Sequence, residues 1–352
     1  MRIVFLYGAA DLYGASRVLE VDVRHLAIEH DVVVVLPFDG PLASRLVSAG
    51  AAVRIDPSLV VLRRVNGLRY RAPRAVPAEC RGADLVVLWT LAVGLYAPLL
   101  RLKRIRFGLS IHELLPSVAG AVLARVASFG ASWVHVNSVA VQDWILESTG
   151  LLATVVYPSV SPRLGQALEP HSDRQSCLRL VLAGRTNGRK GHLAAIDATV
   201  LARRRGVAVT LDLFGDPFPG QQRAHDAVLD ACRRHDEIVY CGAYDGEAPP
   251  FEEYDLVLAL PTFPEPFGLT PVEAWAAGTR SLGWAAGGLT EALVLADGIV
   301  ATSATVSAVA DAIEWVARHE EMLLRSPRRD APAAILCTAE RRARQWAPTV
   351  LT

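Results

Sequence analysis

Two glutamates, Glu265 and Glu273, have the surroundings that most strongly suggest chemistry in this chain. Glu265 lies in a proline-rich loop after an apolar run, and Glu273 lies within the next predicted helix. Pro271 suits the first position of that helix, because its missing N–H would have no partner there. The free N–H groups at a helix start favour anions, so we expect an anion site beside Glu265.

Glu273 also has a structural explanation. With Thr270 as the N-cap, Thr270 and Glu273 form a capping box, in which the glutamate accepts a hydrogen bond from the backbone N–H of the cap residue. Such a box stabilises a helix by about 1 kcal/mol. The spacing does not separate this role from ligand binding, so both stay open.

A second segment, residues 183–192, supplies positive charge after another apolar run. It contains Arg185 and Lys190, and Lys190 is one of two lysines in the chain, the other being Lys103. It is not a P-loop, because the glycine spacing differs and no Ser or Thr follows the lysine. Fixed cations of this kind stabilise the charge that develops on a leaving phosphate. A solvated turn is the alternative.

These two motifs resemble family 4 of the retaining glycosyltransferases. Residues 265–278, EPFGLTPVEAWAAG, are similar to the family's E-x7-E signature, and residues 184–191 are similar to its G-R-x-x-x-x-K-G element. The resemblance implies that Glu265 contacts the transferred sugar and that Glu273 binds the ribose of the donor nucleotide.

The same resemblance implies how the donor diphosphate and sugar are held. The diphosphate is assigned to Arg185, Lys190, Gly268 and Leu269, and the sugar also to the backbone of Phe267 and Gly268. No metal-binding D-x-D motif stands in a suitable loop. We therefore expect no metal and no cofactor, with the nucleotide sugar as a co-substrate.

Weaker candidates lie nearer the start of the chain. Gly14 and Ala15 resemble the family's loop before the first helix, which implies an acceptor or phosphate contact. The loop lacks the G-x-G-x-x-G pattern, which disfavours a dinucleotide site. His112 follows a predicted strand and resembles the family's histidine-containing loop that faces the donor sugar, which makes it a catalytic candidate. A structural histidine is the alternative.

The elements that must position these residues alternate between strand and helix, which predicts an α/β chain with parallel sheets. Strands are expected at residues 2–7, 31–36, 52–55, 85–88, 106–110, 133–136, 154–156, 179–183, 208–214, 238–240 and 256–260. Helices are expected at residues 15–29, 42–49, 192–205, 222–234, 271–277, 306–318 and 333–346.

This pattern predicts two Rossmann-like, doubly wound domains that face a cleft, the GT-B architecture. We expect an N-terminal acceptor-side domain at 1–160, a linker at 161–177 and a nucleotide-sugar-binding domain at 178–330. A C-terminal helix at 331–352 could pack back on the first domain.

Composition and charge limit the kinds of partner that we expect this protein to bind. The formal net charge is +0, which gives no electrostatic case for nucleic acid. Five cysteines without C-x-x-C spacing fit a reduced, cytoplasmic protein. The region from Arg63 to Arg106 is rich in arginine, so it could meet an anionic membrane at the inner face or a phosphate-bearing acceptor. A solvated face is the alternative.

The expected function is retaining transfer of a sugar from a nucleoside diphosphate sugar, of UDP or GDP type, to an acceptor hydroxyl. The resemblance suggests bacterial cell-envelope polysaccharide or glycolipid synthesis, or the synthesis of natural-product glycosides. A non-catalytic nucleotide-sugar-binding protein and a GT-B sugar-nucleotide epimerase remain as alternatives. The sequence does not specify the acceptor.

Overall fold

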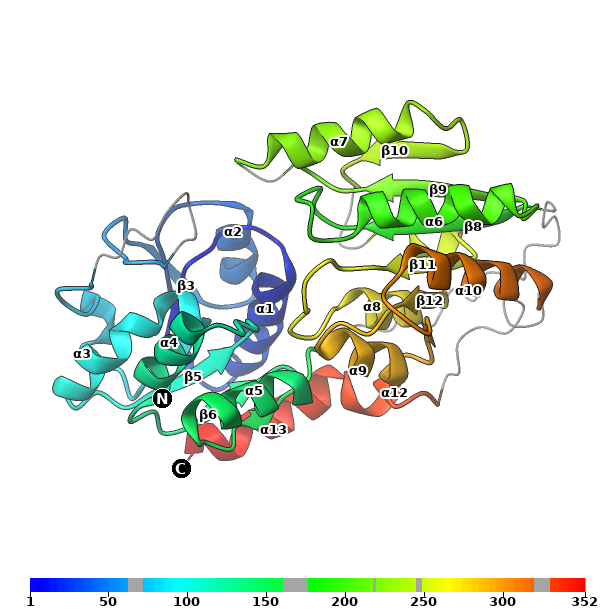
Figure 1. The fold of residues 1–352 in the computed structure, drawn as a ribbon. Coiled ribbons are helices and arrows are strands. Elements are labelled where there is room, and N and C mark those ends of the chain that lie inside the picture. The colour runs from blue at the N-terminus through cyan, green and yellow to red at the C-terminus, as the bar shows by residue number, and fades with distance from the viewer. Residues whose placement is uncertain (63–71, 161–176, 218–219, 245–248, 320–329, 352) are drawn as a thin grey trace. The chain divides into compact units, whose positions relative to one another are not determined.

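The computed structural model describes residues 1–62, 72–160, 177–217, 220–244, 249–319 and 330–351. The chain divides into two compact units (Figure 1). The first unit comprises Met1–Ser159 and Thr338–Thr352, and the second comprises Val160–Cys337. Apart from Cys177, the predicted linker at 161–177 lies outside the described residues.

The first unit contains a seven-stranded parallel sheet with the order β3-β2-β1-β4-β5-β6-β7. Its strands are β1 (Arg2–Tyr7), β2 (Asp31–Leu36), β3 (Ala52–Ile55), β4 (Leu85–Trp89), β5 (Phe107–Ile111), β6 (Val134–Val136) and β7 (Thr154–Val155). The chain winds outward from β1 in both directions, so the strand order reverses between β1 and β4. Because all strands are parallel, their carboxyl ends meet at one edge of the sheet.

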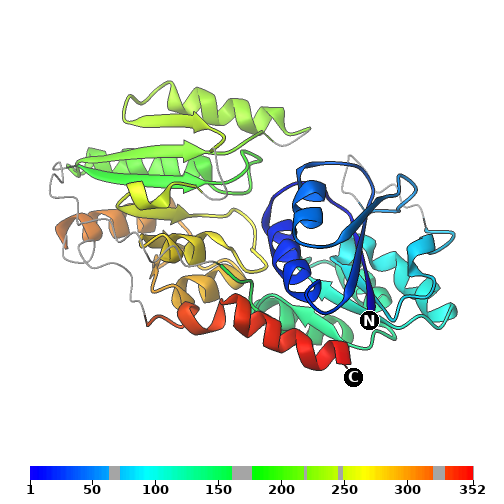
Figure 2. The ribbon, with the colours of Figure 1, turned by 180° about the vertical axis from the view of Figure 1, so that it is seen from behind.

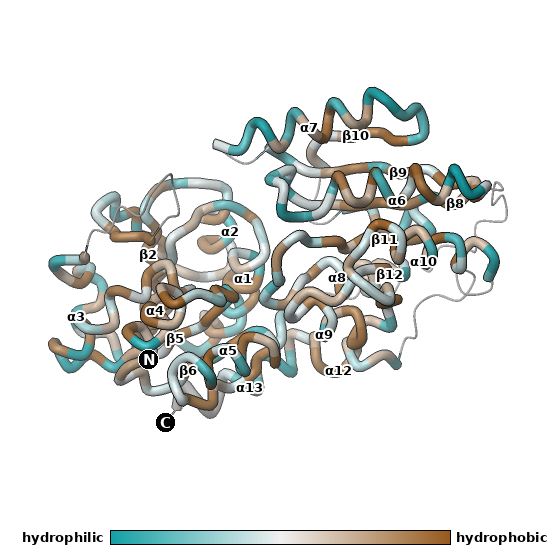
Figure 3. The backbone as a smooth tube through the Cα atoms, in the orientation of Figure 1, coloured by the Kyte–Doolittle hydropathy of each residue, from teal (hydrophilic) through white to brown (hydrophobic). Residues whose placement is uncertain are grey.

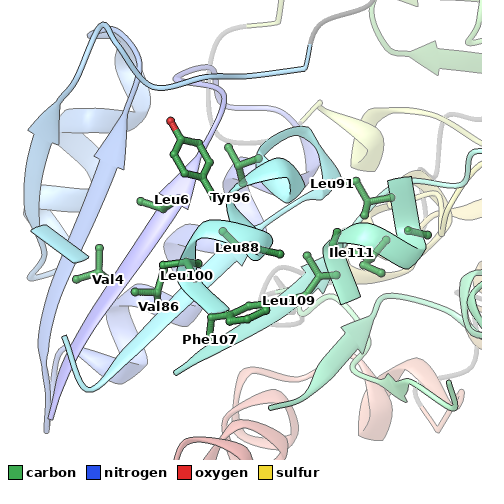
Figure 4. Packing of buried hydrophobic residues seen from close by; sticks show 14 of the residues in the cluster. Val4, Leu6, Val86, Leu88, Leu91, Tyr96, Leu100, Phe107, Leu109 and Ile111 are labelled. Carbon is green, nitrogen blue, oxygen red and sulfur yellow. The ribbon is translucent and has the colours of Figure 1, made fainter. Parts of the chain in front are cut away.

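Alternate side chains of β1 and β4 fill two separate cores on the two faces of this sheet. On one face (Figure 4), Val4, Leu6, Val86 and Leu88 pack beneath a helical layer. This layer consists of the 3-10 helix η2 (Leu91–Tyr96) and helices α3 (Ala97–Leu102), α4 (Val118–Ser128) and α5 (Val139–Thr149). The opposite face is covered by α1 (Gly14–Leu26), α2 (Pro41–Ser48) and α13 (Ala339–Leu351).

The second unit contains a six-stranded parallel sheet with the order β10-β9-β8-β11-β12-β13. Figure 2 shows the ribbon of this unit from behind. Its strands are β8 (Leu178–Ala183), β9 (Val209–Phe214), β10 (Ile238–Gly242), β11 (Leu256–Ala259), β12 (Arg280–Gly283) and β13 (Ile299–Val300). Figure 3 shows hydrophobic segments of these strands in brown and hydrophilic turns of the outer helix α7 (Gln222–Cys232) in teal.

Helices cover both faces of the second sheet as well. One core lies beneath α6 (His192–Arg204), α7 and α10 (Val306–Arg318). The other face packs against α8 (Thr270–Ala276) and α9 (Gly288–Leu295). Both units are therefore Rossmann-like, as the sequence predicts.

The C-terminal segment differs from the single helix predicted at 333–346. It forms α12 (Ala333–Leu336) and then α13, because the Thr338 hydroxyl accepts a hydrogen bond from the Arg341 backbone N–H (3.1 Å) and starts a new helix. α13 packs on α1 and buries Trp346 in the first unit. The C-terminal helix therefore does pack back on the first unit.

Candidate functional site

Two loops of the second unit meet at the carboxyl ends of the neighbouring strands β8 and β11. The Thr262 backbone N–H donates to the carbonyl of Arg189, and the Thr262 hydroxyl donates to the carbonyl of Gly188, both at 2.9 Å. Gly191 has a φ of +81°, and a Cβ there would lie 1.8 Å from the carbonyl oxygen of Leu260. Glycine at this position allows the two loops to approach this closely.

This contact between the two loops brings Lys190 and Glu265 together. The Lys190 Nζ lies 2.7 Å from the Glu265 Oε1, with 38% of the lysine side chain and 18% of the glutamate side chain exposed. The Glu265 backbone N–H donates to the carbonyl of Ala286 (3.1 Å), and the Gly288 N–H donates to the carbonyl of Glu265 (2.8 Å). The loops that follow the adjacent strands β8, β11 and β12 therefore hold this ion pair in place.

Arg185 lies half-buried in the same loop as Lys190. The next residue, Thr186, donates its hydroxyl to the carbonyl of Asp216 (3.1 Å) and contacts His225 Nδ1 (2.9 Å). The loop that carries both predicted phosphate-binding cations is thus tied to the end of β9.

The capping-box explanation of Glu273 is wrong. Helix α8 begins at Thr270, its N-cap is Leu269, and no side chain caps it. Glu273 therefore lies one position beyond the glutamate of a capping box, and its backbone N–H bonds the carbonyl of Leu269 (2.9 Å). Its side chain is partly buried on the first turns of the helix.

The backbone of the segment from Pro266 to Leu269 rests on α9. Gly268 has a φ of +83°, and a Cβ there would lie 2.8 Å from the Leu289 Cδ1. A Cβ on Gly288 would lie 2.1 Å from the carbonyl oxygen of Pro266. The Phe267 side chain is buried. Packing on α9 therefore fixes this segment, and its backbone makes a left-handed turn at Gly268.

In the first unit, His112 follows β5 at the carboxyl edge of the sheet. Its Nε2 lies 2.9 Å from the Ser110 hydroxyl, and its ring lies 4.6 Å from the Trp89 ring. Burial lowers the pKa of His112 to about 3, with smaller contributions from the charges of Arg342 and His135. The imidazole is therefore neutral near pH 7, so it can position a ligand but carries no positive charge.

Gly14 and Ala15 form the start of α1, and Ala15 contacts the same tryptophan as His112. The Trp89 Nε1 donates to the carbonyl of Ala15 (3.0 Å). The Asp11 carboxylate accepts from the Tyr13 N–H (3.2 Å) immediately before the helix. The structure thus brings the two predicted sites of the first unit to one edge.

Glu113 is a residue that our reading of the sequence missed. Its Oε2 accepts from the backbone N–H groups of Leu91 and His112, each at 3.1 Å. Burial raises the pKa of Glu113, and these hydrogen bonds oppose the rise. The carboxylate ties the end of β4 to the loop that carries His112. The only signal was its position directly after His112.

The described residues contain no group of three or more His, Cys, Asp and Glu side chains that could hold a metal ion. Metal independence stays a prediction. In the same residues, no helix is long and apolar enough to cross a membrane.

Residues 177–319, most of the second unit, match the family model described as "Glycosyl transferases group 1". No curated protein matches the sequence. The fold is that of the GT-B glycosyltransferases, and on this evidence the chain is a transferase of the glycosyltransferase class.

Three solved structures illustrate the likeness in fold. HepE of Anabaena, in complex with UDP and glucose, has a TM-score of 0.80 at 22% identity, covering 100% of this chain and 99% of that one. A glycosyltransferase of Rickettsia africae gives 0.76 at 15%, covering 99% and 97%. A TarM variant of S. aureus, in complex with UDP, fondaparinux and α-GlcNAc-glycerol, gives 0.74 at 10%, covering 100% of both chains.

Two buried histidines of the first unit predict a loss of stability in acid. Burial lowers the pKa of both His112 and His135 to about 3, whereas an unfolded histidine titrates near 6.5. Their contribution is fully present above pH 6.5 and is lost as the pH falls toward 3, by about 1.4 kcal/mol per pH unit for each histidine.

Denaturation of the first unit at pH 7.5 and pH 5.5 measures this loss. His135→Phe should reduce the pH dependence by about half, because the ring is replaced by one that does not titrate. Equal pH dependence in wild type and His135→Phe would contradict the assignment.

Proposed function

We propose that this chain is a retaining, metal-independent glycosyltransferase of family 4 that takes its sugar from a nucleoside diphosphate sugar. The observation that carries the proposal is the contact of Lys190 with Glu265 at the carboxyl edge of the second sheet. A cation for phosphate and a carboxylate for sugar hydroxyls stand side by side there. In Rossmann-like units this edge is where ligands bind.

Each residue of the site then has a role. Lys190 and Arg185 neutralise the donor diphosphate and the charge that develops as it leaves. Glu265 accepts hydrogen bonds from the sugar hydroxyls, and Glu273 accepts them from the ribose. The backbone N–H groups of the turn at Phe267, Gly268 and Leu269 approach the sugar and the diphosphate.

Retention follows from attack on the same face that the phosphate leaves, with the departing phosphate taking the proton of the acceptor hydroxyl. Glu265 then positions the sugar and need not form a bond to it. In the first unit, neutral His112 stays the proposed catalytic candidate, and the loop at Gly14 and Ala15 stays the proposed contact for acceptor or phosphate.

A thermal-shift screen of UDP, GDP, TDP and ADP sugars tests the donor. UDP-glucose is the first candidate, because HepE was solved with UDP and glucose. A donor at about 100 times its Kd stabilises a binding unit by about 2.7 kcal/mol, which corresponds to about 5–10 °C in Tm. No shift with any nucleotide sugar would contradict the proposal.

The two alternatives, an epimerase and a non-catalytic binding protein, are separated by incubating the stabilising donor without acceptor. Slow release of free sugar supports a transferase. An epimerised donor identifies an epimerase, and an unchanged donor after long incubation supports a binding protein.

We place the reaction in bacterial envelope or glycoside synthesis, with the protein in the cytoplasm and at the inner face of the membrane. Exposed apolar and basic residues adjoin one another where α3 and α4 end. Leu102 and Phe129 are exposed, and the Arg101 guanidinium lies 3.8 Å from the centre of the Phe129 ring. Lys103 is exposed beside them, so apolar side chains and positive charge suit an anionic bilayer. Arg63, Arg64, Arg69 and Arg71 of the predicted basic region lie outside the described residues.

Sedimentation with vesicles tests this surface. Wild type should sediment with phosphatidylglycerol vesicles and not with phosphatidylcholine vesicles. Leu102→Asp should weaken sedimentation about fivefold or more, since a charge replaces an apolar contact. Ile28→Asp changes an equally exposed apolar residue of the same unit away from α3 and α4, so it should sediment like wild type. Equal sedimentation with both lipids would contradict membrane attachment.

A further inference from the structure

The ion pair of Lys190 and Glu265 joins the two groups to which the proposed function gives separate ligands. The Lys190 Nζ and the Glu265 Oε1 lie 2.7 Å apart, and both side chains are partly shielded from solvent. A diphosphate at Lys190 and a sugar at Glu265 would each have to displace the partner already present. The pair therefore influences which ligands bind well.

The loops cannot relieve this competition by moving apart. Thr262 is hydrogen-bonded through its backbone and hydroxyl to the loop that carries Lys190. Gly191 and Leu260 are in close backbone contact. Glu265 is held on both sides by hydrogen bonds to Ala286 and Gly288. The competition must therefore be resolved by the two side chains.

A nucleoside diphosphate that carries no sugar should bind weakly beside this ion pair. Its terminal phosphate competes with Glu265 for Lys190 and is repelled by the same carboxylate. A sugar attached to that phosphate removes one ionisable oxygen and supplies hydroxyl donors to the carboxylate, which accepts hydrogen bonds but cannot donate them. The Glu265 carboxylate thus weakens binding of the nucleoside diphosphate and strengthens binding of the nucleoside diphosphate sugar.

We infer, resting on the proposed function, that Glu265 is a specificity-determining residue that makes the site prefer a nucleotide that carries a sugar over the same nucleotide without one. In the empty site Glu265 holds Lys190. When the donor binds, the sugar hydroxyls take up the carboxylate and Lys190 turns to the phosphates. Once the sugar has been transferred, Glu265 recaptures Lys190 and promotes release of the nucleoside diphosphate.

The first measurement is the affinity for UDP by calorimetry. Glu265→Gln keeps the shape of the side chain and removes its charge, so it should bind UDP about tenfold more tightly than wild type. Its affinity for uridine, which has no phosphate, should be unchanged. Glu253→Gln is the matched control, because Glu253 is exposed at the amino end of β11, opposite the site edge. Equal or weaker UDP binding by Glu265→Gln would overturn the inference.

The second measurement does not depend on which base the donor carries. Lys103 and Lys190 are the only lysines of the chain, so labelling lysine with ¹⁵N gives two side-chain ammonium signals, and Lys103 serves as a reference in the same sample. Inorganic pyrophosphate should shift the Lys190 signal at lower concentrations in Glu265→Gln than in wild type. The Lys103 signal should respond alike in both proteins.

The outcomes separate the inference from the proposed function. If no nucleotide binds wild type, the proposed donor class is wrong, and the pyrophosphate titration still decides the role of the pair. The inference would be overturned if the Lys190 ammonium signal shifted at the same pyrophosphate concentration in the two proteins. It would also be overturned if this signal did not shift in either protein.

Discussion

Replacing Glu265 with alanine should reduce kcat by about 100-fold or more, because the carboxylate orients the sugar as its bond to phosphate breaks. Glu273→Ala should instead raise the KM for the donor by about 5- to 20-fold with a smaller change in kcat, because a ribose contact is made in both ground and transition states. Steady-state kinetics with the donor identified by thermal shift measures both effects.

Folding must be separated from chemistry in these variants. The ion pair of Glu265 with Lys190 is partly exposed, so its loss should change the free energy of unfolding by about 1 kcal/mol or less. Glu253→Ala, at an exposed site on the opposite edge, should leave kcat and KM unchanged. Near-wild-type kinetics in both Glu265→Ala and Glu273→Ala would refute the assignment.

Replacing Arg342 with methionine should destabilise the first unit by about 3–5 kcal/mol, because it leaves a buried carboxylate without its cation. The Arg342 Nη2 donates to the Asp22 Oδ2 at 2.7 Å, and both side chains are almost completely buried. The Nη1 also donates to the carbonyls of Val156 and Tyr157, both at 3.0 Å. Burial raises the pKa of Asp22, and Arg342 opposes the rise.

Chemical denaturation followed by tryptophan fluorescence measures this loss. Arg341→Met is the matched control, because Arg341 is the adjacent residue and is exposed, so its replacement should change stability by about 0.5 kcal/mol or less. The double variant Asp22→Asn with Arg342→Met should recover part of the loss, since no buried charge remains. A loss below about 1 kcal/mol in Arg342→Met would show that the buried pair contributes little.

β1 and β2 were predictable because the apolar runs at residues 3–7 and 32–36 are unbroken. β1, β2 and β3 begin and end at the predicted residues. α4 was not predicted, since its sequence is apolar on most sides and Val118 and Val122 are exposed. β13 (Ile299–Val300) was also not predicted.

For the site, parallel topology was enough to predict that Lys190 and Glu265 share a sheet edge, because both follow strands of one domain. Glu113 was overlooked because its role depends on Leu91, which lies after a different strand. Helix α8 begins one residue earlier than predicted, shortly after the left-handed turn at Gly268, so Thr270 is not its N-cap. Arg342 and Asp22 are too far apart in sequence for any local pattern to connect them.

The path of the chain has a consequence for biosynthesis. The first unit is discontinuous, since α13 reaches it only after the whole second unit has been made. Trp346 packs against the rings of Phe5, Trp89, Trp133 and His135. A nascent chain that ends at Cys337 therefore holds every residue of the second unit, while the first unit still exposes these rings. During translation the unit that begins first completes its core last, and in that interval its aromatic surface is open to chaperones and to aggregation.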